Sequence, residues 1–378
     1  MSRRKPSPPP VLPGYAFVRP LGSGGFADVY LYEQDMPRRV VAVKVLCDDA
    51  INPAVLRTFN SEGDILARLS AHASIVTIFQ ASISADGRPY FVMDYCPDTM
   101  AARAKKAPLA IADVLDVGVR IGAALETAHR SGVLHRDIKP SNILVTTLDT
   151  PVLADFGIAA GASLLDDNPD VVAMSIPWSA PEVISQQVSG AIPSEIWSLG
   201  ATLYTLLTGR APFESPSGEK LPRPQHMQRI LKSAYIPTGR ADVPERLENA
   251  LKTSLAKDPS SRYVSMLAFA EELRWIQYEL GVPPTALELA TPEWATAAAP
   301  VDFASDDLRG PVISTVRHDS RRALRAQTLS SAQRLNERSE PSDATRSSRT
   351  KAAVMGGVVG AALATGIVFA VLAVTGTG

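Results

Sequence analysis

Two short segments of the chain carry side chains whose types and spacing could transfer a phosphoryl group. The first is His135-Arg136-Asp137-Ile138-Lys139-Pro140-Ser141-Asn142, and the second, which starts thirteen residues after the first ends, is Asp155-Phe156-Gly157. Asp137 could orient an attacking hydroxyl, and Lys139 could offset developing phosphate charge. Asn142 and Asp155 offer oxygen atoms, the ligands that hard cations such as magnesium prefer. The two segments therefore predict phosphoryl transfer from ATP, and a solvated charged loop explains them less well.

A glycine-rich run lies upstream, between two predicted strands. It reads Leu21-Gly22-Ser23-Gly24-Gly25-Phe26-Ala27-Asp28-Val29. Glycines let backbone amides approach phosphate oxygens closely, so this run is a candidate cover for the phosphates of ATP. By itself, however, the run would also fit an ordinary glycine-rich hairpin.

Lys44 stands alone as a cation in the apolar run Val41-Ala42-Val43-Lys44-Val45. The run should be buried, and an unpaired ammonium group is costly in such a place. An anionic partner is therefore expected for Lys44. A lysine on the surface is the simpler alternative.

Taken together, these motifs resemble those of the Hanks-type serine/threonine protein kinases, and the overall character of the sequence is most similar to that of the membrane-anchored kinases of actinobacteria. The resemblance covers residues 13–281. It implies ATP and magnesium or manganese as cofactors, and protein substrates that accept phosphate on serine or threonine. In this family a lysine two residues after the catalytic aspartate, as Lys139 follows Asp137, accompanies serine/threonine specificity.

The resemblance also implies roles around the nucleotide. Glu62, eighteen residues after Lys44, would pair with that lysine, which would hold the α- and β-phosphates. The backbone of residues 91–96 would bind the adenine edge, with Met93 at the back pocket, although a plain strand end would fit this segment too. The implied ATP-binding residues are Leu21, Gly22, Ser23, Gly24, Gly25, Phe26, Ala27, Val29, Ala42, Lys44, Met93, Asp94, Cys96 and Leu144.

Two positions depart from the family pattern. Ala27 stands where the family has a third glycine, which is the most dispensable of the three, so ATP binding is still expected. Glu195, in Ser194-Glu195-Ile196-Trp197-Ser198-Leu199-Gly200, replaces the shorter aspartate that hydrogen-bonds the catalytic-loop backbone in the family. The catalytic loop is therefore expected to be held slightly differently.

The activation segment, residues 156–182, ends in Ala180-Pro181-Glu182. In the family this glutamate pairs with a later arginine, so an ion pair between Glu182 and Arg262 is expected. Ser175 aligns with the substrate-loop threonine of the family and is expected to contact Asp137 and Lys139.

The same segment has no threonine or tyrosine, and its possible phosphate acceptors are Ser163, Ser175 and Ser179. Arg136 could receive an activating phosphate in this subclass of the family. With Ser175 assigned to the substrate loop, the remaining candidate partners of Arg136 are Ser163, Asp166, Asp167 and Asp170. We hypothesise that carboxylates partly replace the usual activating phosphates.

Apolar periodicity predicts an α+β bilobal fold, with an antiparallel β-sheet and one helix in the N-lobe (residues 13–95) and a mainly helical C-lobe (residues 96–281). Alternating apolar runs predict strands over residues 15–21, 27–32, 39–46 and 89–95. Helical spacing predicts helices over residues 55–69, 111–131, 194–208, 244–255 and 264–280.

Composition bounds the class of protein. Lys and Arg total 38 against 39 Asp and Glu, so a nucleic-acid partner is not expected. The two cysteines, Cys47 and Cys96, are too few for a disulfide framework or a zinc site and fit a reducing cytosol. Residues 1–12 have a basic start but no apolar core, so they read as a disordered proline-rich lead and not as a secretory signal.

The C-terminal part of the chain predicts a membrane anchor. Residues 282–351 are rich in Pro, Ala, Ser, Thr and Arg and read as a disordered linker. Residues 352–375 are uncharged and long enough to span a bilayer, with residues 376–378 as a short external tail; a buried core helix is the alternative. Arg346, Arg349 and Lys351 precede the span and predict a single-pass protein of the plasma membrane with its kinase domain in the cytoplasm.

Two contacts are predicted at this anchor. Residues 317–351 hold nine Arg or Lys against four Asp or Glu, a net charge of +5 that would attract anionic lipid. Gly356 and Gly360 share one helix face and could support a homodimer, although small residues are also common in spans that do not dimerise.

Other classes of function remain open at this point. A pseudokinase scaffold would bind nucleotide or partners without turnover, and Glu195 is the one residue that favours it. A small-molecule kinase of related fold is weaker, because the segment that ends at Glu182 is a feature of kinases with protein substrates.

Overall fold

The computed structural model describes residues 6–24, 27–47, 59, 63, 66–156, 175–214 and 222–290. The chain divides into two compact units, Met1–Val301 and Asp302–Gly378, and every described residue belongs to the first. Within the described ranges, no helix is both long and apolar enough to cross a membrane. Predictions that lie outside these ranges concern Gly25, Phe26, Glu62, Ser163, Asp166, Asp167, Asp170, the linker beyond residue 290, the span 352–375 and its Gly356 and Gly360.

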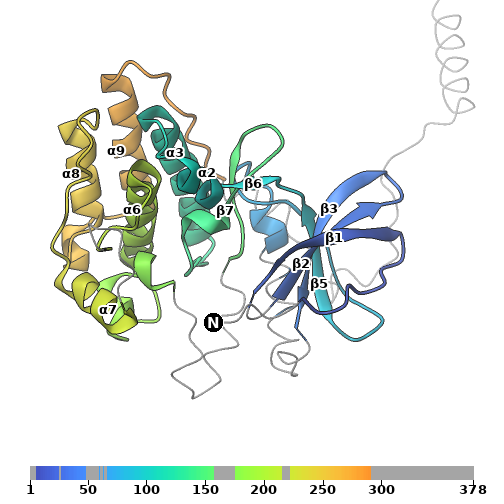
Figure 1. Ribbon diagram of the computed structural model, residues 1–378. Helices are drawn as coiled ribbons and strands as arrows, with labels where there is room; N and C mark the ends of the chain where they lie inside the picture. Colours follow the sequence, from blue (N-terminus) through green and yellow to red (C-terminus); the bar gives the residue numbers. More distant parts are fainter. Residues whose placement is uncertain are drawn as a thin grey trace, which may run out of the picture. The chain divides into compact units, whose positions relative to one another are not determined.

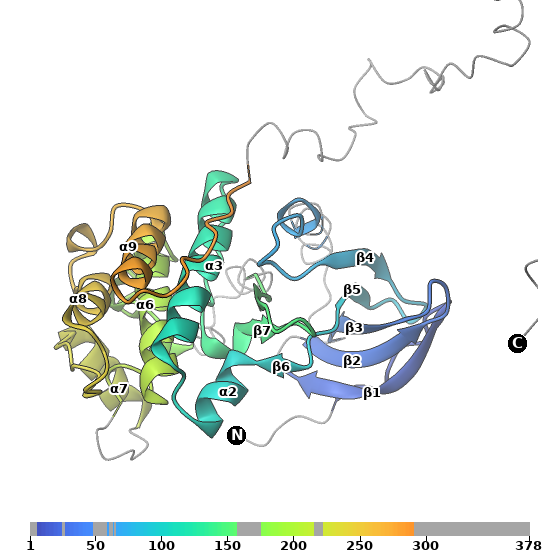
Figure 2. The ribbon, with the colours of Figure 1, turned by 90° about the horizontal axis from the view of Figure 1, so that it is seen from above.

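An antiparallel sheet forms the smaller lobe, and in the described residues it has five strands in the order β1-β2-β3-β5-β4 (Figures 1 and 2). The strands are β1 (Tyr15–Ser23), β2 (Ala27–Gln34), β3 (Arg39–Leu46), β4 (Ile78–Ile83) and β5 (Pro89–Asp94). Four of them were predicted. The edge strand β4 was missed because most of its residues are exposed, so it lacks a clear apolar alternation.

A helix packs beside this sheet. Residues 59, 63 and 66–69 are helical, in agreement with the helix predicted over residues 55–69. The ring of Phe59 lies 4.4 Å from that of Phe91 in β5, so this helix is fixed against the sheet by aromatic packing.

Helices form the larger lobe, seen to the left in Figure 1. They are α2 (Met100–Lys106), α3 (Ile111–Arg130), α5 (Pro181–Ile184), α6 (Ile192–Thr208), α7 (Arg223–Lys232), α8 (Glu245–Ser254) and α9 (Met266–Glu279). Helices α3, α6, α8 and α9 agree with prediction to within two residues at either end, whereas α2, α5 and α7 were not predicted. The short strands β6 (Asp98–Thr99), β7 (Ile143–Val145) and β8 (Pro151–Leu153) form a second sheet beside the catalytic loop.

Close helix packing positions the base of the catalytic loop. A Cβ atom on Gly118 of α3 would lie 2.6 Å from Leu273 Cδ1, and one on Gly122 would lie 2.9 Å from Ala270 Cβ. These two glycines therefore let α9 approach α3 closely. Because α3 leads into the catalytic loop, the arrangement gives that loop a rigid support.

The N-terminal segment differs from the predicted disordered lead. Residues 6–12 run across the sheet, and Leu12 is buried with Tyr30 and Tyr32 in an apolar cluster of the smaller lobe. Proline-rich composition suggested disorder, but tyrosine hydroxyls and an arginine from distant parts of the chain donate hydrogen bonds to the carbonyls of this segment. The ordered domain therefore starts before residue 13.

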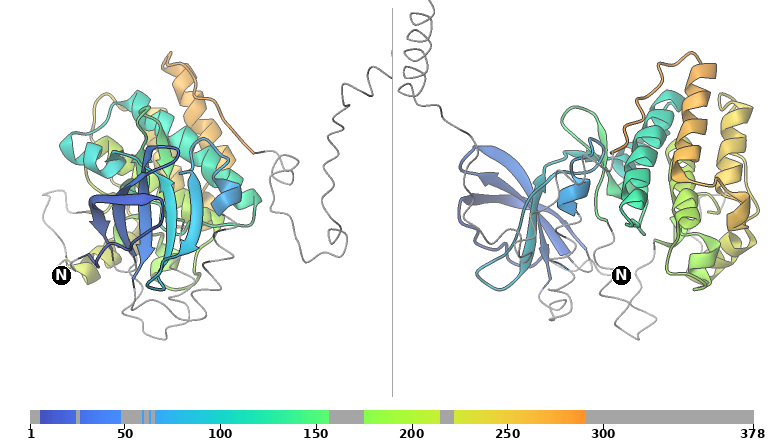
Figure 3. Two further views of the ribbon diagram at one scale, coloured as in Figure 1. Left: turned by 90° about the vertical axis from the view of Figure 1, so that its right-hand side faces the viewer. Right: turned by 180° about the vertical axis from the view of Figure 1, so that it is seen from behind.

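The other end of the domain also differs from prediction. Residues 282–290 were expected to begin a disordered linker, yet they pack along α3 and α9 (Figure 3, orange). The backbone N–H of buried Thr285 donates to the Gln277 side-chain oxygen at 2.9 Å, and the Thr285 hydroxyl accepts a bond from the Gln277 amide nitrogen at 2.8 Å. The same hydroxyl donates to Asp116 at 2.7 Å. These long-range contacts compensate for the polar composition of the segment.

The same segment reaches the smaller lobe through His72. The Ser74 N–H donates to His72 Nδ1 at 3.0 Å, so the proton of the neutral ring lies on Nε2, which donates to the Glu288 carbonyl at 2.9 Å. Burial lowers the pKa of His72 and favours this neutral form. Residues 282–290 thus link both lobes.

A chain truncated after Gly281 is expected to be less stable than one truncated after Ala290. It would leave the amide of Gln277, which is 1% exposed, without its Thr285 partner and would free His72 Nε2. The loss should be about 2 kcal/mol in the free energy of unfolding, or roughly 4 to 8 °C in Tm. Calorimetry of the two chains provides the measurement. Equal Tm values would show that the segment contributes no stability.

Candidate active site

His135 anchors the catalytic loop to the segment before Asp155. Its ring is fully buried, accepts the Asp137 N–H at Nδ1 (3.3 Å) and donates from Nε2 to the Ala154 carbonyl (3.0 Å). Burial lowers the pKa of His135, so the ring is neutral and can make both bonds. The His135 ring also lies 4.6 Å from that of buried Phe156. One side chain therefore holds both predicted chemical segments together.

Asp137, Lys139 and Asn142 converge as the sequence predicted. Lys139 Nζ lies 2.6 Å from Asp137 Oδ2, and Asn142 Nδ2 donates to the same oxygen at 3.0 Å and to the Asp137 carbonyl at 2.8 Å. Two donors thus orient one carboxylate oxygen of Asp137. The second oxygen is directed by the same contacts and can accept the bond of a substrate hydroxyl.

Ser175 joins this group from the end of the activation segment. Its hydroxyl accepts a hydrogen bond of 2.8 Å from Lys139 Nζ, which confirms the predicted contact between these two residues. A direct bond to Asp137 was also expected; instead, Lys139 bridges Asp137 and Ser175. The Ser175 hydroxyl therefore marks the side from which a substrate would approach.

Lys44 extends from β3 and pairs with Asp155, at a distance of 2.6 Å between Nζ and Oδ1. The Lys44 ammonium lowers the pKa of Asp155 and keeps the carboxylate ionised. Asp155 has a φ of 61°, a left-handed conformation that is uncommon for a residue with a side chain and that marks a constrained functional position. Glu62, the partner proposed for Lys44, lies outside the described residues.

The oxygen atoms of Asn142 and Asp155 fit a magnesium ion. Asn142 Nδ2 is used by Asp137, which leaves Oδ1 as its ligand atom, and the Asp155 side chain is about half-exposed at 48%. An amide oxygen and a carboxylate suit magnesium, which also takes phosphate oxygens and water. These two residues would hold the ion, whose charge would offset that of the triphosphate.

The described residues of the glycine-rich run lie at the facing ends of β1 and β2, as predicted. Gly22 pairs with Val29 and Ser23 with Asp28, and the Gly24 N–H donates to the Ala27 carbonyl at 2.9 Å. Ala27 is the first residue of β2, so the alanine in place of a third glycine fits regular strand geometry. The hairpin alone does not identify its ligand.

Several residues expected to bind adenine belong to the main core or pack against it. Ala42 in β3 lies opposite Met93 in β5, and both belong to the main core. The half-buried residues packed against this core include Leu21, Val29, Cys96 and Leu144. Burial raises the pKa of the Cys96 thiol to about 12, so the thiol is neutral. Met93 lines a small cavity together with Lys44 and Phe156, and its role at the back pocket stays a prediction.

Glu195 supports the catalytic loop from below. One of its carboxylate oxygens accepts the Arg136 N–H at 2.6 Å, and the other accepts a bond from His129 Nε2 at 2.6 Å. Arg136 has a φ of 66°, so this bond holds a strained part of the loop backbone. His129 was not singled out from the sequence, because no local pattern connects residue 129 with residue 195.

Glu182 and Arg262 form the expected ion pair. Arg262 donates to the two carboxylate oxygens at 2.7 and 2.8 Å, and the Ser194 hydroxyl donates at 2.7 Å. Burial alone would raise the pKa of Glu182, but the Arg262 and Ser194 bonds hold it below its usual range. The pair ties the end of the activation segment to the larger lobe.

Comparison with known proteins agrees with this geometry. The family model described as "Protein kinase domain" matches residues 15–274. The chain belongs to the protein kinase family. Among curated kinases, it is 38% identical to the serine/threonine-protein kinase PknK of Mycobacterium bovis over 71% of this chain and 24% of PknK. It is 33% identical to PrkC of Bacillus subtilis, over 66% of this chain and 38% of PrkC.

Among solved kinase structures, the PknI kinase domain of Mycobacterium tuberculosis aligns with a TM-score of 0.53 and 27% identity, over 69% of this chain and 94% of that one. The match to PknK spans about a quarter of that relative's length, and the match to PrkC less than half. The shared part is the kinase domain.

Glu195 is expected to be a positioning residue of this kinase. Glu195→Ala would leave the Arg136 N–H and His129 Nε2 without their acceptor, so the loop backbone should relax. We expect kcat to fall roughly tenfold or more with the KM for ATP little changed, because a lost buried acceptor costs about 1 to 3 kcal/mol.

Glu195→Asp restores a carboxylate of the length usual in the family and should retain most of kcat. Steady-state kinetics of the two variants, with Tm as a check on folding, separates positioning from stability. Full kcat in Glu195→Ala would contradict the support role.

Proposed function

We propose that the protein is a serine/threonine protein kinase that transfers the γ-phosphoryl group of ATP to serine or threonine residues of proteins, including itself. The Lys139 bridge between Asp137 and Ser175 carries this proposal. It joins the catalytic loop to the segment on which a protein substrate would lie, which a nucleotide-binding scaffold does not need. The curated relatives are named as serine/threonine-protein kinases.

Each step follows from a placed side chain. Asp137 accepts the hydrogen bond of the substrate hydroxyl and takes its proton as the bond to phosphorus forms. Lys139 neutralises charge on the transferred group and holds Asp137 in place. When ATP and magnesium are bound, Lys44 would contact the phosphates, and Asp155 and Asn142 would hold the ion, which would supply positive charge to offset that of the phosphates. The bond from phosphorus to the leaving oxygen breaks, and ADP is released.

Phosphate transfer to the protein itself and to a generic protein substrate tests the proposal. Intact protein would be incubated with labelled ATP and magnesium beside Lys44→Met and Asp155→Asn variants. Label on the parent protein that both variants reduce to background is expected. Equal label in all three would favour the alternative, a pseudokinase scaffold that binds nucleotide or partners without turnover.

We further propose that residues 352–375 anchor the kinase domain to the inner face of the plasma membrane. The support is the uncharged run itself and the cations at Arg346, Arg349 and Lys351 before it. The protein should then remain in membranes after alkaline extraction, with its kinase domain accessible from the cytoplasmic side. Release into the supernatant would exclude an integral span.

The same anchor suggests two contacts. The +5 charge of residues 317–351, nine basic against four acidic residues, would lie against anionic lipid, and the Gly356 and Gly360 face would support a homodimer. Crosslinking in membranes should detect a dimer that a Gly356→Ile and Gly360→Ile double substitution disrupts. An unchanged crosslinked fraction would argue against this helix face.

A further inference from the structure

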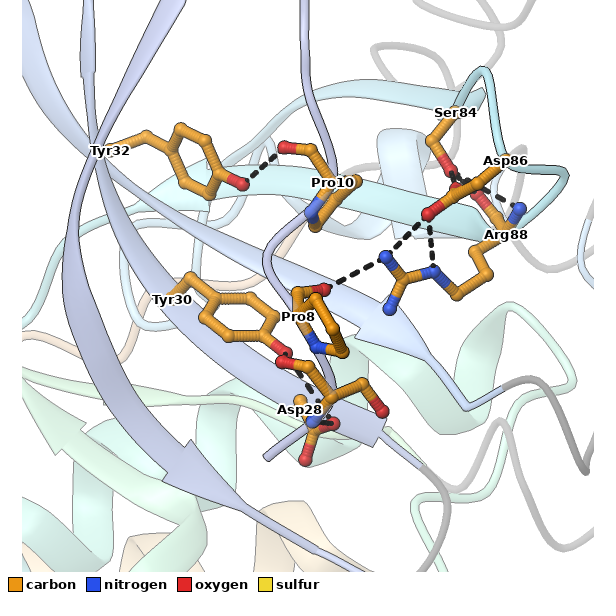
Figure 4. A network of polar contacts seen from close by, with 9 residues as sticks. Pro8, Pro10, Asp28, Tyr30, Tyr32, Ser84, Asp86 and Arg88 are labelled. Carbon is orange, nitrogen blue, oxygen red and sulfur yellow. Dashed lines mark hydrogen bonds and ion pairs between the residues drawn. The ribbon is translucent and has the colours of Figure 1, made fainter. Parts of the chain in front are cut away.

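A strap of the chain, Ser7–Leu12, lies on one face of the smaller lobe's sheet (Figure 4). The strand beneath it is β2, whose residues Asp28, Tyr30 and Tyr32 are spaced two apart and therefore project from the same face. The residue between the first two of these, Val29, projects from the opposite face and packs against the main core beside the expected nucleotide pocket. One strand thus carries the strap on one face and nucleotide-pocket residues on the other.

Two tyrosine hydroxyls bind carbonyl groups of the strap. Tyr30 Oη donates to the Ser7 carbonyl at 2.6 Å, and Tyr32 Oη donates to the Pro10 carbonyl at 2.6 Å (Figure 4). Both rings are buried, at 1% exposure each. Burial raises the pKa of each of these tyrosines to about 12, so both hydroxyls keep their protons and remain donors at ordinary pH.

A charged pair binds the middle of the strap. Arg88, before β5, donates to the Pro8 carbonyl at 2.9 Å and is itself held by the Asp86 carboxylate at 2.5 Å. At the start of the strap, the Ser7 N–H donates to Asp28 Oδ2 at 2.9 Å. Arg88 and Asp28 are buried, at 3% and 1% exposure, so this is a built site and not a chance surface contact.

The chemistry of the strap suits these partners. Pro8, Pro9 and Pro10 have no N–H groups, so their backbone offers acceptors alone, and consecutive prolines favour the extended polyproline conformation before binding. Arg88 donates to the Pro8 carbonyl and Tyr32 to the Pro10 carbonyl, and Tyr30 donates to the preceding Ser7 carbonyl. Leu12, 3% exposed, anchors the strap in the apolar cluster formed by Tyr30, Tyr32 and neighbouring side chains. Proline-rich segments are recognised elsewhere by aromatic grooves of this kind.

The site is connected to the glycine-rich hairpin. Asp28, which binds the strap, pairs with Ser23 across the hairpin, one residue from Gly22 and Gly24. Displacing the strap would leave the buried Asp28 carboxylate without the Ser7 N–H and would loosen the strand that carries Val29. The position of the hairpin over the phosphates should therefore depend on whether the strap is bound.

We propose that this face of the smaller lobe is a binding site for a proline-rich segment, that the chain's own residues 7–12 occupy it, and that its occupancy sets the affinity for ATP through the glycine-rich hairpin. The binding part is independent of the proposed kinase activity, and the coupling needs nucleotide binding but no turnover. Both can therefore be tested on protein that transfers no phosphate.

The first test measures peptide binding. A fluorescent peptide with the sequence of residues 6–13 would be titrated into intact protein and into protein lacking residues 1–12. We expect binding to the truncated chain and none to the intact chain, whose site is filled. The full-length Leu12→Ser chain lacks the apolar side chain that anchors the strap, so it should also bind the peptide. This variant provides the test if the truncated chain fails to fold.

A matched control removes the donors and keeps the rings. Tyr30→Phe with Tyr32→Phe, placed in the truncated chain or in the Leu12→Ser chain, should weaken peptide binding roughly tenfold or more, because two hydrogen bonds are lost. A peptide in which Pro8, Pro9 and Pro10 are alanine should bind less tightly than the native one. No binding to either opened chain, or equal binding by the double-phenylalanine variant, would overturn the site.

The second test measures coupling to the nucleotide. A fluorescent ATP analogue should bind severalfold more weakly to the Leu12→Ser chain, and saturating peptide should restore its affinity. Hydrogen exchange should rise in residues 21–29 and stay unchanged in α6, which would distinguish a local effect from general destabilisation. Equal nucleotide affinity with and without the strap would overturn the coupling and leave the peptide site in place.

Discussion

Asp137→Asn should lower kcat by about 10²- to 10⁴-fold, the usual contribution of a positioned acid–base group. The substitution keeps the shape of the side chain but removes its charge, so it can no longer take the proton of the substrate hydroxyl. Lys139 and Asn142 both donate to Asp137 Oδ2, and the amide can still accept there through its own oxygen. The loop should therefore keep its conformation while losing its chemistry.

The measurements are kcat, the affinity for an ATP analogue and Tm. Nucleotide affinity should be nearly unchanged, because in this structure Lys44 and Asp155 form a separate pair on the nucleotide side. Asp113→Asn, an exposed aspartate in the first turn of α3, serves as the matched control and should retain full activity. Activity of Asp137→Asn within threefold of the parent would contradict the role given to this carboxylate.

The chemistry of the site was readable from the sequence because its residues are close in sequence. Asp137, Lys139 and Asn142 lie within six positions, and the turn Pro140–Asn142 forces their side chains to converge. Helices α3 and α6 were equally predictable, since burial along them follows from their own apolar residues. Local composition and periodicity are sufficient for such features.

Contacts between distant parts of the chain were predicted only where the family resemblance supplied them, as for Glu182 with Arg262. Other distant contacts were not predicted. His129 and Glu195 are 66 positions apart, and Lys44 and Asp155 are 111 apart. The strap at residues 7–12 and the segment 282–290 have the polar or proline-rich composition of disordered chain. They are ordered because Tyr30, Tyr32 and Gln277 offer hydrogen-bonding groups that no reading of the segments alone would reveal.

Glu195, which departs from the family aspartate, still supports the catalytic loop. Compared with an aspartate, the side chain is one methylene longer, and the sequence suggested a differently held loop. In the structure its two oxygens reach Arg136 N and His129 Nε2 at 2.6 Å each, so the longer side chain still makes the supporting bond. Glu195, the one residue that favoured a pseudokinase, therefore no longer supports that alternative.

Arg262→Met should be the most destabilising of the substitutions considered. Arg262 donates to both oxygens of Glu182 and to the Pro193 carbonyl, and its guanidinium lies 5.0 Å from the Trp197 ring. Its removal would leave the Glu182 carboxylate, which is 9% exposed, with the Ser194 hydroxyl but without a countercharge. Breaking such a pair costs about 3 to 5 kcal/mol, or roughly 10 °C in Tm for a domain of this size.

A double substitution, Arg262→Met with Glu182→Gln, provides the control. It removes the unpaired charge and should recover part of the lost stability, because the penalty comes mainly from the buried anion left behind. Chemical denaturation of the parent, the two single variants and the double variant gives the coupling energy. A double variant that is no more stable than Arg262→Met would show that the loss comes from packing against Trp197 and not from charge.

The stability difference should also depend on pH, with a sign that follows from Glu182. Its pKa is lowered in the folded parent, so the pair stabilises the fold above the ordinary carboxyl pKa of about 4 and loses this effect as the pH falls through the lowered value. In Arg262→Met burial acts without the guanidinium and should raise the pKa of Glu182. As the pH falls, Glu182 therefore becomes protonated in the folded variant before it does so in the parent, and the cost of its buried charge disappears. The gap between parent and variant should therefore narrow as the pH falls from about 7 toward 4. A gap that stays constant would mean that the pKa of Glu182 in the folded variant is not raised above its value in the unfolded chain, and that the cost of losing Arg262 is not electrostatic.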